Sequence, residues 1–152
     1  MAETTDGMLE REIYIEAPRE TVFGFLVEPD KMVQWMGTEA TFENRPGGLY
    51  RVNVNGEDVA RGEVVEVTPP ERVVFTWGWE GGETLPPSQS LIEITLAPKG
   101  AGTMLKMVHS GIPEPMVGPH GDGWDHFVPR LAIVAAGGDP GRDSWIKEKA
   151  AS

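Results

Sequence analysis

Few side chains in this sequence could carry out chemistry, and His109 is the most prominent of them. In the segment TMLKMVHS, residues 103–110, every second side chain shares one face of a predicted strand: Thr103, Leu105, Met107 and His109. This face is apolar, so an imidazole on it could move protons or orient a hydroxyl or carbonyl group of a ligand. A buried, neutral histidine that is hydrogen-bonded to the backbone is the structural alternative.

Glu63 is the second candidate for acid–base chemistry. If Val65 and Val67 point inward, strand alternation brings Arg61 and Glu63 to the same face, where the pair could orient the polar end of a ligand. Other catalytic patterns are absent from the sequence, which has no cysteine, no serine in a nucleophile elbow and no lysine in the RPGG turn at residues 45–48. The sequence therefore assigns no catalytic residue and leaves His109 and Glu63 as candidates.

Four potential metal ligands lie close together in HGDGWDH, residues 120–126. The spacing of His120, Asp122, Asp125 and His126 fits no standard zinc or calcium site. Asp122 can instead cap the start of a helix, and Asp125 then lies in its first turn, where a negative charge is favourable. We therefore predict neither a metal ion nor another cofactor.

Aromatic side chains gather in VVFTWGWEGG, residues 73–82. Along an extended strand, one wholly apolar face is made by Val73, Phe75, Trp77 and Trp79. These side chains either fill a core or line a pocket, and the glycines at positions 81 and 82 could form the mouth of that pocket. A buried indole also needs an acceptor for its N–H group, which a ligand or a water molecule could supply.

The elements that hold these residues follow from periodicity and turn signals. Residues 9–16 alternate between apolar and polar side chains, which predicts a first strand. Residues 17–36 show helical spacing that Pro29 interrupts, so we expect two short helices, the second capped by Asp30 and carrying Met32, Trp35 and Met36. Between residues 38 and 110, turn signals separate about six further strands, whose short connections favour antiparallel neighbours.

The pattern becomes helical again near the carboxyl terminus. After Asp122, apolar side chains recur at helical spacing: Trp124, Phe127, Val128 and Leu131. We predict one long helix that Gly137 terminates, in which Pro129 removes one amide and bends the axis. No linker or repeat divides the chain, so all 152 residues are predicted to form one domain with flexible tails at residues 1–7 and 140–152.

Composition argues against several classes of protein. Thirteen basic and 24 acidic residues give a net charge of −11, which repels nucleic acid and anionic membranes. The amino terminus has no apolar run, and nowhere do about 18 consecutive apolar residues occur, so we expect neither a signal peptide nor a transmembrane segment. We expect a cytoplasmic protein, and the unpaired edges of an open sheet would permit a homodimer.

The order of elements, together with several motifs, resembles one known family. The motifs lie at residues 15–23, 35–36, 45–51, 62–77, 102–111 and 123–131. They resemble the family related to the activator of Hsp90 ATPase (AHSA1-like), within the START and Bet v 1 (SRPBCC) superfamily. The resemblance implies an α+β helix-grip fold: a curved antiparallel sheet of six or seven strands around a long carboxy-terminal helix, with two short helices after the first strand. In many members of this superfamily, a cavity between sheet and helix holds an apolar small molecule.

The resemblance and the apolar faces together predict a set of ligand-binding residues: Trp35, Tyr50, Val52, Phe75, Trp77, Trp79, Ile94, Met107, His109, Trp124, Phe127, Val128 and Leu131. We predict that they bind a hydrophobic, aromatic small molecule in an internal cavity, in a carrier or sequestration role. Two alternatives stay open. One is an enzyme of the polyketide cyclase/aromatase kind, in which His109 and Glu63 move protons, and the other is a co-chaperone-like module that binds Hsp90.

Overall fold

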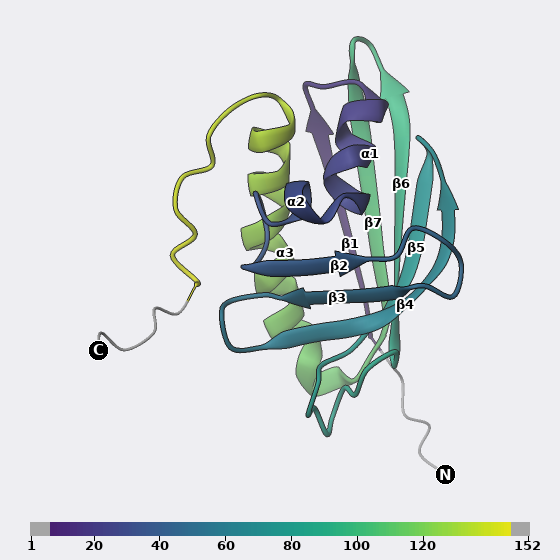
Figure 1. Ribbon diagram of the computed structural model, residues 1–152, viewed down its shortest axis with the longest axis vertical. Helices are drawn as coiled ribbons and strands as arrows, with labels where there is room; N and C mark the ends of the chain where they lie inside the picture. The colour runs from purple at the N-terminus through teal and green to yellow at the C-terminus, as the bar shows by residue number, and fades with distance from the viewer. Residues whose placement is uncertain (1–6, 147–152) are drawn as a thin grey trace.

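Within residues 7–146, which the computed structural model describes, seven antiparallel strands form one sheet and three helices pack against it (Figure 1). The strands are β1 (Gly7–Ile15), β2 (Glu39–Phe42), β3 (Leu49–Asn53), β4 (Val59–Thr68), β5 (Arg72–Trp77), β6 (Ser90–Lys99) and β7 (Gly102–Ile112). The helices are α1 (Arg19–Val27), α2 (Pro29–Met32) and α3 (Glu114–Ala135). The predicted α+β helix-grip fold is therefore confirmed.

The sheet is curved around the long helix. Its strand order is β1-β7-β6-β5-β4-β3-β2, and β2 and β3 run across the direction of β1, β6 and β7 (Figure 1). Helix α3 packs along β1, while α1 contacts α2, α3 and the long strands β6 and β7. The apolar side chains of the sheet and of all three helices meet in one buried cluster between them.

Strand alternation places the predicted apolar faces inside this cluster. The buried side chains of β5 and β7 include Val73, Phe75, Trp77, Thr103, Leu105, Met107 and His109. Regular pairing of β5 ends at Trp77, and an isolated bridge between Trp79 and Ala60 continues the strand direction beyond it. The two tryptophans therefore share one face, as their spacing predicts.

A β-bulge in β4 decides where Arg61 and Glu63 point. The pairing of β4 with β5 shifts register between Val64 and Glu66, so Val64 and Val67 both pack on the inner face although they are three residues apart, while Val65 is exposed. Arg61 and Glu63 alternate with the buried positions and are exposed on the outer face of the sheet. The interpretation that turned both side chains inward is therefore wrong.

The second short helix is shorter than predicted. It ends at Met32, and Asp30 lies inside it rather than at its cap, because Pro29 occupies the first helical position. Trp35 follows in a turn, where its indole N–H donates to the carbonyl oxygen of Phe25 over 2.9 Å. This hydrogen bond ties the turn to α1.

Helix α3 begins at Glu114, well before the predicted start at Asp122. Pro115 lies in its first turn, where the missing amide costs no hydrogen bond, and the helix continues through Pro129. Gly137 lies just beyond its end with a φ of 91°, the left-handed conformation expected of a helix stop. Neither α3 nor the other helices of the described residues are long and apolar enough to span a membrane.

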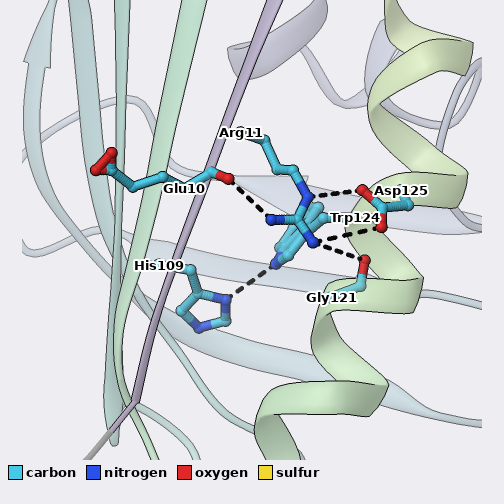
Figure 2. A network of polar contacts seen from close by, with 6 residues as sticks. All are labelled: Glu10, Arg11, His109, Gly121, Trp124 and Asp125. Atoms are coloured by element: carbon cyan, nitrogen blue, oxygen red, sulfur yellow. Dashed lines mark hydrogen bonds and ion pairs between the residues drawn. The ribbon is translucent and has the colours of Figure 1, made fainter.

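Arg11 joins β1 to α3, as Figure 2 shows. Its Nε donates to Oδ1 of Asp125 over 2.6 Å, and its Nη2 donates to Oδ2 over 3.3 Å and lies 3.5 Å from the carbonyl oxygen of Gly121. Its Nη1 donates to the carbonyl oxygen of Glu10. Asp125 thus joins the sheet to the helix through Arg11. It lies in the middle of α3, and not in the first turn of the helix as we predicted.

We expect Asp125→Asn to lower the free energy of unfolding by less than about 1 kcal/mol, because the carboxylate is 62% exposed and solvent screens the pair. Urea unfolding at low and high salt measures the difference, and Asp122→Asn, an exposed carboxylate of the same helix, is the control. A loss above about 2 kcal/mol would show that the pair is not a screened surface contact.

Candidate functional site: the tryptophan cleft

Two spaces lie between the sheet and α3, and they differ greatly in size. The deeper one measures about 20 Å³, room for about one water molecule and far less than the ~300 Å³ at the lower end of small-molecule sites. It is lined by several predicted ligand-binding residues: Trp35, Tyr50, Phe75, Ile94, Met107, Val128 and Leu131. Side chains of the protein occupy most of this interior, so the space at this position is too small for the ligand that we predicted.

The larger space is a cleft of about 600 Å³ where the β3–β4 hairpin, the β5–β6 loop and the first turns of α3 meet. We call it the tryptophan cleft, because its lining includes Trp77, Trp79, Trp124 and Trp145. Phe127 also lines it, and Gly81 and Gly82 lie at its edge, where we predicted a mouth. Among the predicted ligand-binding residues, Val52 and His109 line neither this cleft nor the deeper space.

Met36 and Trp124 separate the two spaces. Both side chains line the cleft on one side and the deeper space on the other, and both are buried. The indole of Trp124 also lies 5.3 Å from the ring centroid of Trp77. The cleft therefore ends at a partition of packed side chains.

His120 lines the cleft and accepts hydrogen bonds from two tryptophans at once. Its Nε2 accepts the indole N–H of Trp79 over 3.0 Å and that of Trp77 over 3.3 Å. An indole nitrogen can only donate, so Nε2 carries no proton, and the proton on Nδ1 is donated to the carbonyl oxygen of Met116 over 2.9 Å. The three contacts fix one tautomer of a neutral imidazole.

His109 forms a second network of the same kind behind the first. Its Nδ1 accepts the indole N–H of Trp124 over 3.0 Å (Figure 2), which leaves the proton on Nε2. Nε2 donates to Ser90 Oγ over 2.8 Å, and that hydroxyl donates to the carbonyl oxygen of Trp77 over 2.7 Å. Every polar atom of His109 is therefore engaged within the protein.

Burial keeps both imidazoles uncharged. It lowers the pKa of His109 from 6.5 to about 3, and the neighbouring His120 contributes to the shift. Burial also lowers the pKa of His120, against the opposing effect of its hydrogen bond to Met116. The pKa of His109 therefore lies far below the range near neutrality that suits a general acid or base.

The buried indoles need no ligand to satisfy their N–H groups. Trp35 donates to a backbone carbonyl, Trp124 donates to His109, and Trp77 and Trp79 donate to His120. The hypothesis that a bound molecule or water supplies the acceptors is therefore wrong for these four residues. A ligand would instead contact the ring faces and edges that line the cleft.

Gly78 lies between Trp77 and Trp79, at the point where the β5–β6 loop crosses close over the strand. A Cβ atom at this position would collide with the backbone of Pro86 and Pro87 in the β5–β6 loop. The glycine amide and carbonyl pair with the backbone of Arg61. The loop can therefore pack directly over the strand and form one edge of the cleft.

The segment after α3 forms another wall of the cleft. Asp143, only 4% exposed, accepts hydrogen bonds at Oδ1 from His126 Nε2 over 2.7 Å and from the amide of Trp145 over 2.9 Å. The Trp145 indole stacks on the His126 ring at 4.1 Å and 3°. Residues 140–146, which we expected to be part of a flexible tail, thus contact α3, while residues 1–6 and 147–152 lie outside the described part of the chain.

We expect Asp143→Ala to release this wall. The amide of Trp145 loses its acceptor, so its hydrogen exchange should accelerate by about tenfold or more, the factor that corresponds to about 1.4 kcal/mol of lost protection. The midpoint of global unfolding should change much less, because the segment adds few side chains to the core. Asp122→Ala, which removes an exposed carboxylate from the same helix as His126, is the control. Equal exchange at Trp145 in the two variants would contradict the assignment.

Sequence analysis did not predict several residues of the cleft lining, among them Asp58, His120 and Trp145. Because α3 begins at Glu114, His120 lies one helical turn after Met116 and one before Trp124, on the buried side. A sequence prediction that began this helix at Glu114 would therefore have placed His120 on its apolar face. No pattern in the sequence indicates that Trp145 folds back onto α3.

The residues considered as metal ligands do not come together. Within residues 7–146, no group of three or more histidine and carboxylate side chains is placed to hold a metal ion. His120 faces the tryptophans, Asp125 pairs with Arg11, and His126 pairs with Asp143. Asp122, predicted as a helix cap, is exposed within α3.

Comparison with solved structures identifies close relatives of this fold. The solution structure of an AHSA1-like protein from Rhizobium etli is 42% identical, has a TM-score of 0.76, and is matched over 100% of this chain and 97% of that chain. DynU16, a protein of the dynemicin biosynthetic locus, is 26% identical with a TM-score of 0.75, over 90% of this chain and 50% of that chain. The Aha1 dimer from Colwellia psychrerythraea shares the fold, with 17% identity and a TM-score of 0.75 over 86% of this chain and 96% of that chain.

Comparison with curated proteins finds no match. The family model described as activator of Hsp90 ATPase homologue 1-like protein matches residues 16–136, which is most of the chain. Together with the relative from Rhizobium etli, this match establishes that the chain belongs to the activator of Hsp90 ATPase homologue 1-like (AHSA1-like) family.

Proposed function

We propose that this protein binds a hydrophobic, aromatic small molecule in the tryptophan cleft and acts as a carrier or sequestering module. The observation that supports the proposal is the cleft itself. Its volume of about 600 Å³ falls within the range of about 300–1,000 Å³ that is typical of small-molecule sites. Its lining includes four tryptophans and Phe127, whose rings favour stacked and edge-on contacts with an aromatic guest.

The polar groups of the cleft favour binding over turnover. His120 is the histidine that lines the cleft, and both of its nitrogens are already hydrogen-bonded. The proton-transfer pair of the cyclase/aromatase alternative is not assembled, because His109 lies behind the cleft and Glu63 lies on the outer face. An enzyme of that kind would need a different acid or base.

Gly123 offers a direct test of the proposal. It lies on α3 in the cleft lining, and a Cβ atom added there meets nothing within 4 Å. Gly123→Leu should therefore place a side chain in the cleft without disturbing the core. Gly118→Leu is the matched control, because Gly118 lies on the same helix with equally open surroundings but outside the lining. Both changes raise helix propensity by roughly 1 kcal/mol.

The neutral fluorescent probe N-phenyl-1-naphthylamine is suited to this test, followed by native mass spectrometry with a panel of neutral polycyclic aromatic compounds. We expect saturable binding to the natural protein and to Gly118→Leu, and at least about tenfold weaker binding to Gly123→Leu, which corresponds to about 1.4 kcal/mol. Equal binding to all three proteins would place the probe elsewhere. If neither the probe nor any compound of the panel binds, the proposed function is wrong.

Two predictions about macromolecular partners are tested separately. The proposal predicts that the Hsp90 middle domain does not capture this protein in a pull-down, and capture would favour the co-chaperone hypothesis instead. The sheet ends at β1 and β2, so a homodimer could form through either edge. Light scattering across a range of concentrations measures whether it does.

A further inference from the structure

Among residues 7–146, the charged side chains that line the tryptophan cleft are all acidic. Glu57 and Asp58 line it from the β3–β4 hairpin, and Glu80 lines it from the β5–β6 loop. No lysine or arginine of the described residues belongs to the lining. An apolar guest would therefore meet carboxylates, and no cation of the protein, at the edge of the cleft.

These carboxylates differ in how far neighbouring cations balance their charge. Glu80 accepts hydrogen bonds from Arg51 over 2.8 Å and from Arg61 over 3.2 Å, so two guanidinium groups compensate it. Asp58 accepts a hydrogen bond from the side-chain amide of Asn55 over 2.8 Å. That amide is neutral, so the bond orients the Asp58 carboxylate and leaves its negative charge in place.

The floor of the cleft adds aromatic surface and no positive charge. Trp77, Trp79 and Trp124 line it, and Trp145, which is 42% exposed, lines it closer to solvent. The face of an indole attracts a cation that comes within about 6 Å of the ring centroid. His120 is held neutral by the two indole N–H groups that it accepts, so it does not repel such a cation. The net charge of −11 attracts cations to the molecule as a whole.

We propose that the tryptophan cleft selects ligands that carry a positively charged amine or quaternary ammonium group on an apolar body, with the charge toward Asp58. This inference rests on the proposed function and adds to it the charge class of the ligand. The apolar body lies against the indole rings, where burial of its surface provides affinity. The ammonium group lies where aromatic faces and an uncompensated carboxylate both favour a cation.

Three probes of nearly the same shape separate charge from hydrophobicity. Benzyltrimethylammonium carries a positive charge, neopentylbenzene is its neutral carbon analogue, and phenylmethanesulfonate carries a negative charge. We expect the cation to bind about fivefold tighter than the neutral compound, and the anion to bind weakest, in titrations followed by NMR. The preference should shrink when salt is raised from about 50 mM to about 500 mM, because the Debye length then falls below about 5 Å.

Asp58→Asn, compared with Glu63→Gln, tests where the charge lies. Both changes remove one carboxylate, but Glu63 lies on the outer face of the sheet, away from the cleft. We expect Asp58→Asn to weaken binding of the cation about threefold or more and to leave the neutral compound unaffected, while Glu63→Gln changes neither. The salt dependence in the natural protein provides a second measurement that requires no variant.

The outcomes separate this inference from the proposed function. If the neutral compound binds as tightly as the cation, or the anion binds best, the charge preference is wrong while the aromatic site stands. If none of the three compounds binds, the charge preference is wrong, and the titration with N-phenyl-1-naphthylamine decides the proposed function independently.

Discussion

We expect the Trp77→Ala variant to lose about 3–5 kcal/mol of its free energy of unfolding, the largest effect of any single change considered for this protein. The side chain is 3% exposed, and its ring lies 5.3 Å from the centroids of both Trp79 and Trp124 and 5.9 Å from that of Tyr50. Truncation therefore opens a hole where several large rings meet. The melting temperature should fall by roughly 10 °C or more.

Trp77→Phe is the matched control for that experiment. It keeps most of the ring volume and removes the indole N–H. His120, which accepts that N–H in the natural protein, still accepts the indole N–H of Trp79 in the variant. We expect a loss of about 1–2 kcal/mol, which assigns the remainder to packing. If Trp77→Ala unfolds entirely, the phenylalanine variant still measures the contribution of the hydrogen bond. Equal stabilities of the natural protein and the alanine variant would contradict the packing described for Trp77.

Acidification from pH 6.5 towards pH 3 should remove much of the stability of the protein through its buried imidazoles. In the unfolded chain, His109 takes up a proton near pH 6.5, whereas burial lowers its pKa in the folded protein to about 3. The unfolded state therefore binds more protons between these values, and the free energy of unfolding falls as the pH falls. The contribution of His109 is complete above pH 6.5 and amounts to roughly 4–5 kcal/mol over the whole interval. The lowered pKa of His120 acts in the same direction.

The His109→Gln variant separates this contribution from that of the carboxylates. Urea unfolding at several pH values between 7.5 and 4 gives the slope for each protein, and the carboxylates are common to both. We expect a shallower slope for the variant, whatever its stability at neutral pH. Parallel slopes would mean that the folded protein protonates His109 as readily as the unfolded chain does.

The arrangement of the sheet could be predicted from sequence because the relevant signals are local. Alternating side chains mark the strands, and the four positions predicted to share one face of β7, Thr103, Leu105, Met107 and His109, are all buried. In β4 the same reasoning fails, since a bulge adds one residue at Val65 and reverses the alternation. A bulge has no necessary signature in composition, so the outward placement of Glu63 required the three-dimensional pairing.

The extent of α3 could not be predicted from propensity. Its first half contains Gly118, Pro119, Gly121 and Gly123, all of which disfavour a helix in isolation. Packing against the sheet stabilises this half of the helix, which places His120 beneath the indoles of Trp77 and Trp79. The candidate site therefore depends on the part of the helix for which local sequence gives the weakest evidence.

The volume of the site could not be predicted either. Sequence indicates which faces are apolar, but it does not say whether side chains of facing elements meet or leave a gap. Within residues 7–146 they meet over most of the interior and leave the larger space near the β3–β4 hairpin and the β5–β6 loop. The predicted aromatic residues are accordingly divided between a solid core and an open cleft.

The partition formed by Met36 and Trp124 sets the depth of the tryptophan cleft. Methionine is unbranched and can change rotamer at small cost. Because Met36 lines both spaces, a shorter side chain at this position would also open the partition between the cleft and the space lined by Tyr50 and Phe75. The cleft would then extend by a small volume towards the middle of the molecule. If the cleft binds a ligand as proposed, exchange of this one side chain would change the length of ligand that it admits, with the surrounding scaffold unchanged.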